Sequence, residues 1–246
     1  MNEKKCNYVL KYIILGDSEV GKSNLLRRMN SEEFQNDYNE TIGIEFLALN
    51  KELDNKIYEL KILDTVGNES FRSSIFPFLN NRVCALIVYE IDKRKSFENI
   101  TKWIEELKRY APKTVLMILI GNKCDLNEKR KVTEEEGREL AEKNGMLFFE
   151  TSAKTGENVE EVLNESFELI IKKMNENYYN LEKNNCGIEK PKYKNNFVAG
   201  DTLEKENEIK EENENKGENE NEEENENQEE NENHKKSKCP CFRCFE

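Results

Sequence analysis

The sequence predicts an α/β domain with a doubly wound, mostly parallel sheet. Apolar runs of strand length alternate along the chain with segments whose apolar residues recur at helical spacing. Two of the runs, at 83–91 and 115–120, are continuous, as in parallel strands that are covered on both faces. A glycine-rich turn at 16–23 leads from the first apolar run into the first helical segment, which places it where such sheets bind ligands.

The first half of the chain supplies one helix and three strands. Residues 8–15 predict a buried strand, and residues 22–29 predict the first helix. After a polar connection, two further strands are expected at 44–49 and 57–63. The dipeptide Asp54-Asn55 marks a hairpin turn between them.

The second half continues the alternation. Ser96 is a candidate N-cap for a helix with an apolar stripe. Thr133 and Glu136 have the spacing of a capping box at the start of the next helix. A short strand at 146–149 precedes a last helix at 158–174, and the helical spacing of its aromatic and apolar residues indicates core packing rather than a cofactor site.

The domain is expected to span 8–174, after a polar extension at 1–7. Beyond 174 the apolar pattern stops, and 175–246 is predicted to be a disordered tail. Within the tail, the Asn/Glu-rich run 204–233 contributes −12 of the formal net charge of −13. The acidic composition therefore describes the tail and predicts nothing about partners of the domain.

The turn 16–23 has the residues that a phosphate-binding loop requires. It reads Gly-Asp-Ser-Glu-Val-Gly-Lys-Ser, which matches the P-loop pattern G-x-x-x-x-G-K-S between a strand and a helix. Its glycines let backbone N–H groups point at an anion, and the helix N-terminus adds partial positive charge. Lys22 can reach β- and γ-phosphates, and the Ser23 hydroxyl can bind Mg²⁺. The alternative is a chance glycine turn, which the lysine, the hydroxyl and the flanking elements disfavour.

Three further segments, each following a strand, distinguish GTP from ATP. Asp64 can hold Mg²⁺ through water, and the N–H of Gly67 can meet a γ-phosphate. The segment 122–125, Asn-Lys-Cys-Asp, places an aspartate that can accept two hydrogen bonds from guanine, a pair that adenine does not offer. The segment 152–154, Ser-Ala-Lys, can give a backbone N–H to guanine O6. Ligands of open α/β sheets bind at the carboxyl ends of the strands, so together these segments indicate a guanine-nucleotide site.

On these motifs, with Thr-Ile-Gly at 41–43 and Glu-Thr at 150–151, the sequence resembles a Ras-superfamily small GTPase of the Rab branch over about residues 8–174. The resemblance implies the P-loop NTPase fold, with six strands and five helices. It also implies hydrolysis of GTP to GDP and phosphate, in a switch that regulates vesicle-mediated membrane traffic. The stretches 42–47, 71–73 and 129–132 are most similar to the Rab group of the Golgi and retrograde traffic.

The resemblance assigns roles around the phosphates. Lys22 would hold the β- and γ-phosphates. Ser23 and Thr41 would give hydroxyls to Mg²⁺, with Asp64 behind them through water. Thr41 and Gly67 would be tethered to the γ-phosphate, and hydrolysis would release both segments.

The same resemblance assigns the base and the full set of nucleotide contacts. Phe34 would lie edge-on against the base, and Lys22 and Asn68 would be the catalytic residues. The implied GTP-binding residues are Ser18, Glu19, Val20, Gly21, Lys22, Ser23, Asn24, Phe34, Tyr38, Thr41, Gly67, Asn122, Lys123, Asp125, Ser152, Ala153 and Lys154.

Asn68 departs from the family, which has a glutamine here to orient the attacking water. The asparagine is one methylene shorter, and a misplacement of about 1 Å can cost roughly 10²-fold in rate. We therefore expect slow intrinsic hydrolysis and a long-lived GTP state. Activating proteins of the family can bring their own glutamine, so assisted hydrolysis is compatible with Asn68. The alternative is that the substitution is neutral, since catalysis of this kind is mostly positioning.

Other departures affect the phosphate loop and effector binding. Glu19 replaces a small residue, and its carboxylate either faces the phosphates, which would speed nucleotide release, or points to solvent. Leu63 and Val66 replace a tryptophan and an alanine of the family. Phe46 and Phe78 still match an aromatic patch used for effector docking.

Three cysteines near the C-terminus predict lipid anchoring. Rab chains carry two geranylgeranylated cysteines near the end. Cys239, Cys241 and Cys244 offer this chemistry, although their distances from the C-terminus differ from the usual motifs. Two lipid chains would anchor stably, and nearby lysines would favour an anionic leaflet. A zinc site and unmodified thiols are the alternatives.

The implied partners follow the Rab cycle. They are GTP and GDP, an exchange factor, a GTPase-activating protein, an escort protein or GDP-dissociation inhibitor, trafficking effectors and a membrane. No signal sequence or membrane span is apparent, and the cysteine usage fits a reducing compartment. We expect the cytosolic face of Golgi or endosomal membranes, in exchange with the cytosol. Nucleic-acid binding has no support in the composition.

Two other functions remain open. Asn68 also fits a GTP-bound scaffold with negligible hydrolysis. An ATP-dependent P-loop enzyme such as a kinase is the third reading, and Asp125 argues against it.

Overall fold

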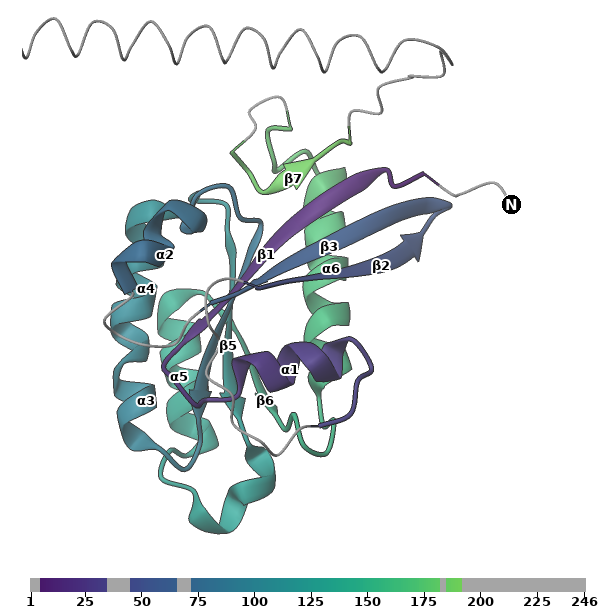
Figure 1. Ribbon diagram of the computed structural model, residues 1–246. Coiled ribbons are helices and arrows are strands. Elements are labelled where there is room, and N and C mark those ends of the chain that lie inside the picture. Colours follow the sequence, from purple (N-terminus) through teal and green to yellow (C-terminus); the bar gives the residue numbers. More distant parts are fainter. Residues whose placement is uncertain (1–4, 35–44, 66–71, 182–184, 192–246) are drawn as a thin grey trace, which may run out of the picture. The chain divides into compact units, whose positions relative to one another are not determined.

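The structure is a computed structural model that describes residues 5–34, 45–65, 72–181 and 185–191 (Figure 1). Strands and helices alternate along these residues as the sequence predicts. In chain order they are β1 (Tyr8–Gly16), α1 (Lys22–Met29), β2 (Glu45–Leu53), β3 (Lys56–Asp64), α2 (Arg72–Leu79), β4 (Cys84–Glu90), α3 (Arg94–Glu98), α4 (Ile100–Tyr110), β5 (Leu116–Asn122), the 3₁₀ helix η2 (Cys124–Lys129), α5 (Glu134–Asn144), β6 (Leu147–Thr151), α6 (Val159–Asn175) and β7 (Ile188–Glu189).

The strands form one sheet in the order β2-β3-β1-β4-β5-β6, and β7 pairs with β1. Among the described residues, β2 and β7 are the strands that run antiparallel to their partners, and the other pairs are parallel. The mostly parallel six-stranded sheet of the prediction is confirmed, with β7 added. The parallel strands end at one edge, where Gly16, Asp64, Glu90, Asn122 and Thr151 are their last residues. This edge therefore collects the predicted ligand-binding segments.

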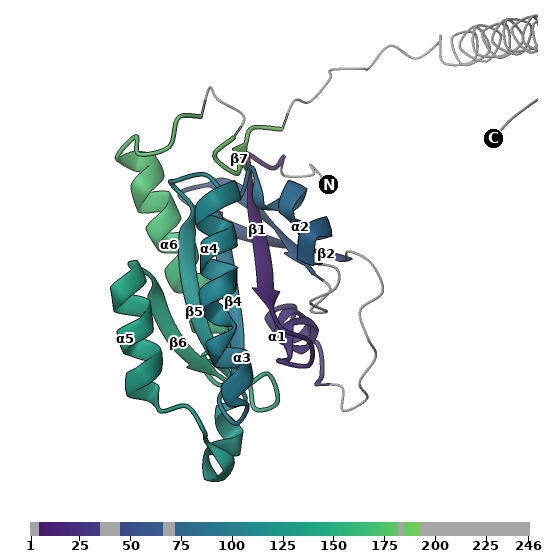
Figure 2. The same cartoon turned by 90° about the vertical axis from the view of Figure 1, so that its left-hand side faces the viewer.

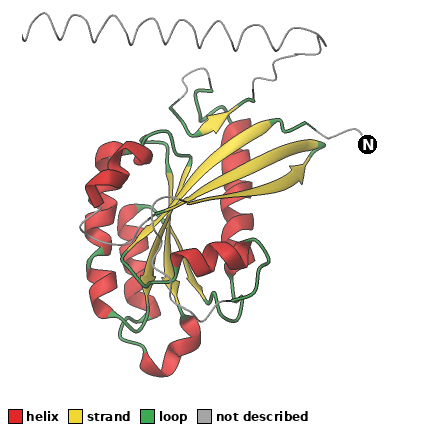
Figure 3. Cartoon of the chain, in the orientation of Figure 1, coloured by secondary structure: helices red, strands yellow, loops and turns green. Residues whose placement is uncertain are grey.

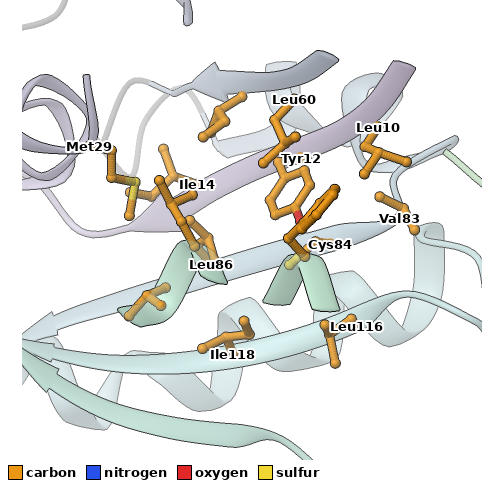
Figure 4. Packing of buried hydrophobic residues seen from close by; sticks show 14 of the residues in the cluster. Leu10, Tyr12, Ile14, Met29, Leu60, Val83, Cys84, Leu86, Leu116 and Ile118 are labelled. Atoms are coloured by element: carbon orange, nitrogen blue, oxygen red, sulfur yellow. The ribbon is translucent and has the colours of Figure 1, made fainter. Parts of the chain in front are cut away.

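Helices cover both faces of the sheet (Figures 2 and 3). Helices α1 and α6 pack in one buried cluster, and α2, α4 and α5 pack in the other. Strand β1 contributes alternate side chains to each, Tyr12 and Ile14 to the first and Ile13 and Leu15 to the second. Figure 4 shows part of the first cluster, with Leu86 of β4. Burial on both faces explains why the central strands are continuous apolar runs.

The hairpin turn between β2 and β3 is confirmed. Leu53 pairs with Lys56, so the loop consists of Asp54 and Asn55. Both have positive φ angles, 51° and 59°. Such angles belong to a type I′ turn, whose twist matches that of the flanking strands.

Of the two predicted helix starts, one is confirmed and one is wrong. The capping box is present, because the N–H of Glu136 donates to Thr133 Oγ1 at 3.2 Å and the N–H of Thr133 donates to the Glu136 carboxylate at 3.0 Å. Ser96 is not an N-cap but lies buried within α3. Its hydroxyl donates to the Lys93 carbonyl at 2.7 Å and accepts from the N–H of Glu90 at 3.0 Å, so it closes the turn between β4 and α3. The single predicted helix is divided at 99 into α3 and α4.

The predicted domain boundary at 174 is too early. We call residues 185–191 the C-terminal strap. Its Cys186 and Ile188 are buried in the cluster under α1 and α6, as is Tyr179 after α6. The N–H of Lys11 donates to the Gly187 carbonyl at 2.8 Å. The strap thus extends the fold, although its few apolar residues have no periodicity that would predict it.

Candidate guanine-nucleotide site

The phosphate loop between β1 and α1 adopts a backbone that requires glycine at two positions. Gly16 and Gly21 have φ angles of 144° and 92°. A Cβ atom on Gly16 would collide with the Val88 carbonyl oxygen, and one on Gly21 with the side-chain amide of Asn122. These approaches bring the loop against β4 and β5, at the sheet edge where α1 begins.

Lys22 is the buried cation of this loop. Its ammonium donates to the carbonyl oxygens of Gly16 at 3.0 Å and Asp17 at 2.9 Å. Burial lowers the pKa of Lys22 to about 8, and the carboxylates of Asp64 and Asp17 oppose that shift. A buried ammonium is costly unless anions surround it. The arrangement therefore favours a polyphosphate, whose negative charge would stabilise the charged lysine.

Ser23 and Asp64 are the two residues of the predicted metal site that the structure describes. Ser23 Oγ donates to Asp64 Oδ2 at 2.5 Å, which joins the start of α1 to the end of β3. Oxygen ligands of this kind suit Mg²⁺, which keeps several waters and takes the rest of its ligands from carboxylates, hydroxyls and phosphates. The residues present therefore fit the cation that the sequence implies.

Asp17 ties the phosphate loop to the junction of α3 and α4, a role that the sequence did not reveal. Its two carboxylate oxygens accept hydrogen bonds from Asn99 at 2.7 Å and from the Trp103 indole N–H at 3.1 Å. Both donors are buried, at the junction of α3 and α4. In the sequence, Asp17 is one of the variable positions of the P-loop pattern, and nothing in its spacing predicts these partners.

Asn122 connects the phosphate loop with the predicted base-binding segments. Its amide nitrogen donates to the Val20 carbonyl at 2.8 Å. Its amide oxygen accepts from the Thr151 hydroxyl at 3.2 Å and from the N–H of Ala153 at 3.4 Å. The side chain is 1% exposed, so these bonds are formed away from water.

Asp125, the predicted guanine reader, is held in place by a neighbouring loop. The Ser152 hydroxyl donates to Asp125 Oδ1 at 2.6 Å. Arg28 of α1 binds the same loop, donating to the carbonyls of Ala153 at 3.1 Å and Lys154 at 2.7 Å. The structure thus brings together the segments 122–125 and 152–154. Arg28 was missed by sequence reasoning because an arginine on an exposed helix face is ordinary.

Glu19 points to solvent, which decides between the two orientations considered above. Its carboxylate lies 3.3 Å from the Lys93 ammonium, and both side chains are exposed, at 57% and 45%. Its backbone is left-handed, with φ 69°, which a glycine would adopt more easily. The carboxylate is therefore paired with a cation outside the phosphate loop.

The remaining predicted residues are placed as follows. Ser18 and Val20 lie in the phosphate loop, and Asn24 lies in the first turn of α1. Phe34 packs, partly buried, against the cluster under α1 and α6. Tyr38, Thr41, Val66, Gly67, Asn68, Cys239, Cys241 and Cys244 lie outside the described residues.

The two aromatic residues of the proposed effector patch differ in exposure. Phe46 on the edge strand β2 is 67% exposed, whereas Phe78 of α2 packs partly against the second cluster. Leu63 is fully buried, so its replacement of a tryptophan acts within the core. None of the helices in the described part of the chain combines the length and apolar character that a membrane span needs.

Comparison with known proteins identifies the family. The model of the Ras family matches residues 11–175. The chain belongs to the Ras family. Within it, Rab proteins are the relatives: Ras-related protein Rab-2B of Dictyostelium discoideum is 44% identical over 170 residues, which cover 69% of this chain and 84% of the relative. Ras-related protein RABA6a of Arabidopsis thaliana is 44% identical over 65% of this chain and 68% of the relative, and Ras-related protein Rab11A of Lotus japonicus is 43% identical over 69% and 76%.

This Ras-family chain is a Rab-type small GTPase, as the motifs predicted. The Rab branch binds GTP with Mg²⁺, hydrolyses it, and regulates membrane traffic together with regulators and effectors on intracellular membranes. The relatives carry the names of different Rab groups at similar identity. The comparison therefore does not single out the Golgi group that the sequence favoured.

Proposed function

We propose that this Rab-type protein is a GTP-dependent switch whose nucleotide is held by the residues assigned above. The observation that carries the proposal is the position of the two loops, which meet at one sheet edge through Asn122. One of its hydrogen bonds goes to the phosphate loop, and two go to the segment around Ala153. The test is competition of GTP and ATP against a fluorescent GDP analogue with Mg²⁺. GTP should displace the analogue and ATP should not, and equal displacement would refute guanine recognition by Asp125.

We further propose that intrinsic hydrolysis is slow because Asn68 stands at the water-orienting position. The shorter side chain places its amide about 1 Å or more from where a glutamine amide would lie, and a shift of that size can cost roughly 10²-fold. Single-turnover hydrolysis by the purified protein should therefore be much slower than hydrolysis by the Asn68→Gln variant. Equal rates would remove the proposal.

A GTP-bound scaffold with negligible hydrolysis is the second candidate, favoured by the same asparagine. The two functions differ when a GTPase-activating protein of the Rab type is present. A switch should then turn over GTP, because the activating protein can supply a glutamine. A scaffold should remain bound to GTP.

The proposed place of action is the cytosolic face of Golgi or endosomal vesicles. Anchoring would depend on lipidation among Cys239, Cys241 and Cys244, since two lipid chains give stable membrane attachment. An escort protein or GDP-dissociation inhibitor would carry the lipidated form through the cytosol. Mass spectrometry of the C-terminal peptide from native membranes tests this, and unmodified thiols on all three cysteines would refute it.

A further inference from the structure

We infer that Glu90 is a positioning residue for the base-binding segment 122–125, acting through Lys123. This inference rests on the proposed guanine-nucleotide site. Glu90 belongs to none of the nucleotide-binding motifs. Its carboxylate lies 2.9 Å from the Lys123 ammonium, which joins the last residue of β4 to the residue after β5.

Lys123 needs such an anchor because its backbone is strained. It is left-handed, with φ 66° and ψ 37°, and it directly precedes η2, which carries Asp125. This conformation costs a residue with a side chain about 1–2 kcal/mol, so other contacts must hold it. The Lys123 side chain runs past the phosphate loop, where its Cε would lie 3.9 Å from a Cβ atom on Gly21. Fixing Lys123 therefore fixes the approach of the base segment to the phosphate loop.

Glu90 is itself held rigidly, which a positioning residue requires. It is opposite Asn122 in the β4–β5 register, and the N–H of Ile91 donates to the Asn122 carbonyl at 3.1 Å. The Ser96 hydroxyl accepts from the N–H of Glu90 at 3.0 Å. The residue is 8% exposed. The backbone next to Glu90 and the side chain of Glu90 are thus tied to Asn122 and Lys123, the two residues that begin the base segment.

The charges around Glu90 make Lys123 its necessary partner. Burial raises the pKa of Glu90, the neighbouring Asp92 carboxyl raises it further, and Lys123 lowers it. The Asp92 carboxyl repels the buried carboxylate of Glu90, and the ammonium of Lys123 offsets this repulsion. The pair therefore differs from the exposed pairs of this chain, such as Glu19 with Lys93, which contribute little.

The test is dissociation of a fluorescent GDP analogue from the full-length protein with Mg²⁺. Glu90→Gln should speed dissociation about 10-fold, the factor that corresponds to roughly 1.4 kcal/mol. Glu90→Asp keeps the charge and should fall between Glu90→Gln and the wild type. Glu142→Gln is the matched control, because Glu142 is an exposed carboxylate of α5, and it should dissociate like the wild type.

A double-mutant cycle separates positioning from a general effect on stability. In a Lys123→Met background, Glu90→Gln should give no further acceleration, since its route to the nucleotide is gone. The same acceleration in both backgrounds would overturn the inference, as would a Glu90→Gln rate equal to the wild type. If the wild type itself fails to bind GDP, the proposed function fails, and the inference fails with it.

Discussion

Gly187 of the C-terminal strap is the position where a single methyl group should have a large and specific effect. Its φ angle is 76°, and a Cβ atom would lie less than 3.0 Å from backbone atoms of Arg82 and Val83, closer than real Cβ atoms approach. These backbone atoms directly precede β4 and cannot move aside as a side-chain tip can. Gly187→Ala should therefore lift the strap away from β1. Gly145 is the matched control, because its φ is 67° and a Cβ atom there meets nothing within 4 Å.

The magnitude follows from what the strap buries. Gly145→Ala should cost only the left-handed backbone penalty, about 1–2 kcal/mol. Gly187→Ala should cost the contribution of the strap instead, because lifting it relieves the clash. Ile188 is 2% exposed and Cys186 is 4% exposed, and burial of a large aliphatic side chain contributes about 1.5–3 kcal/mol, to which the cysteine adds. We expect Gly187→Ala to lower the free energy of unfolding by about 3–4 kcal/mol.

Two measurements check this expectation. Urea unfolding compares both variants with the wild type. Labelling of the native protein with a thiol reagent, followed by peptide mapping, reports the Cys186 thiol separately from the other cysteines. Cys186 should react much faster in Gly187→Ala and no faster in Gly145→Ala. If the two variants are equally stable and their Cys186 thiols are equally protected, a methyl group at position 187 does not displace the strap and the reasoning is refuted.

Two further predictions concern charges. In the capping box, the hydrogen bond from the N–H of Thr133, and then the one from Arg94, lower the pKa of Glu136 below 4.5. The ionised carboxylate therefore stabilises the fold fully above pH 4.5, and this stabilisation is lost as the pH falls through the lowered pKa. The difference in urea unfolding between wild type and Glu136→Gln should shrink below pH 4.5, and a difference that is constant with pH would contradict this. Glu19→Gly should stabilise the fold by about 1 kcal/mol, because it relieves a left-handed backbone and gives up only an exposed ion pair with Lys93. Its release of fluorescent GDP should equal that of the wild type, and slower release would mean that the carboxylate acts on the phosphates.

The fold was predictable where local chemistry determines it. The boundaries of α1 match the predicted helix, because a glycine turn precedes it and an apolar stripe runs along it. The capping box at Thr133 and the hairpin turn at Asp54 were predictable for the same reason, since each is formed by residues within four positions of one another in sequence. The order of the phosphate and base motifs was also predictable, because parallel strands of such a sheet end at one edge.

What the sequence did not predict depends on a competing turn and on contacts between distant segments. Serine is a common N-cap residue, but the hydroxyl of Ser96 binds the Lys93 carbonyl in the turn after β4 instead of capping a helix. The strap contains a strand of two residues, too short for a periodic pattern. Its binding depends on how Gly187 fits against the backbone of Arg82 and Val83, just before β4. Arg28 and Asp17 support the site through partners far away in sequence, which no local pattern encodes.

Contacts between the motifs and the rest of the fold explain how short motifs can form one site. Asn99 and Trp103, at the junction of α3 and α4, hold the phosphate loop through Asp17. Glu90 of β4 holds the segment 122–125 through Lys123, and Arg28 of α1 holds the loop after β6. Asn122 then joins the two, with a hydrogen bond to Val20 on one side and bonds to the loop after β6 on the other. Because a bond lost at Asn122 would free both loops at once, phosphate binding and base binding should weaken together. In the proposed function, the motifs supply the groups that touch the nucleotide, and the surrounding helices and strands hold these groups at one edge of the sheet.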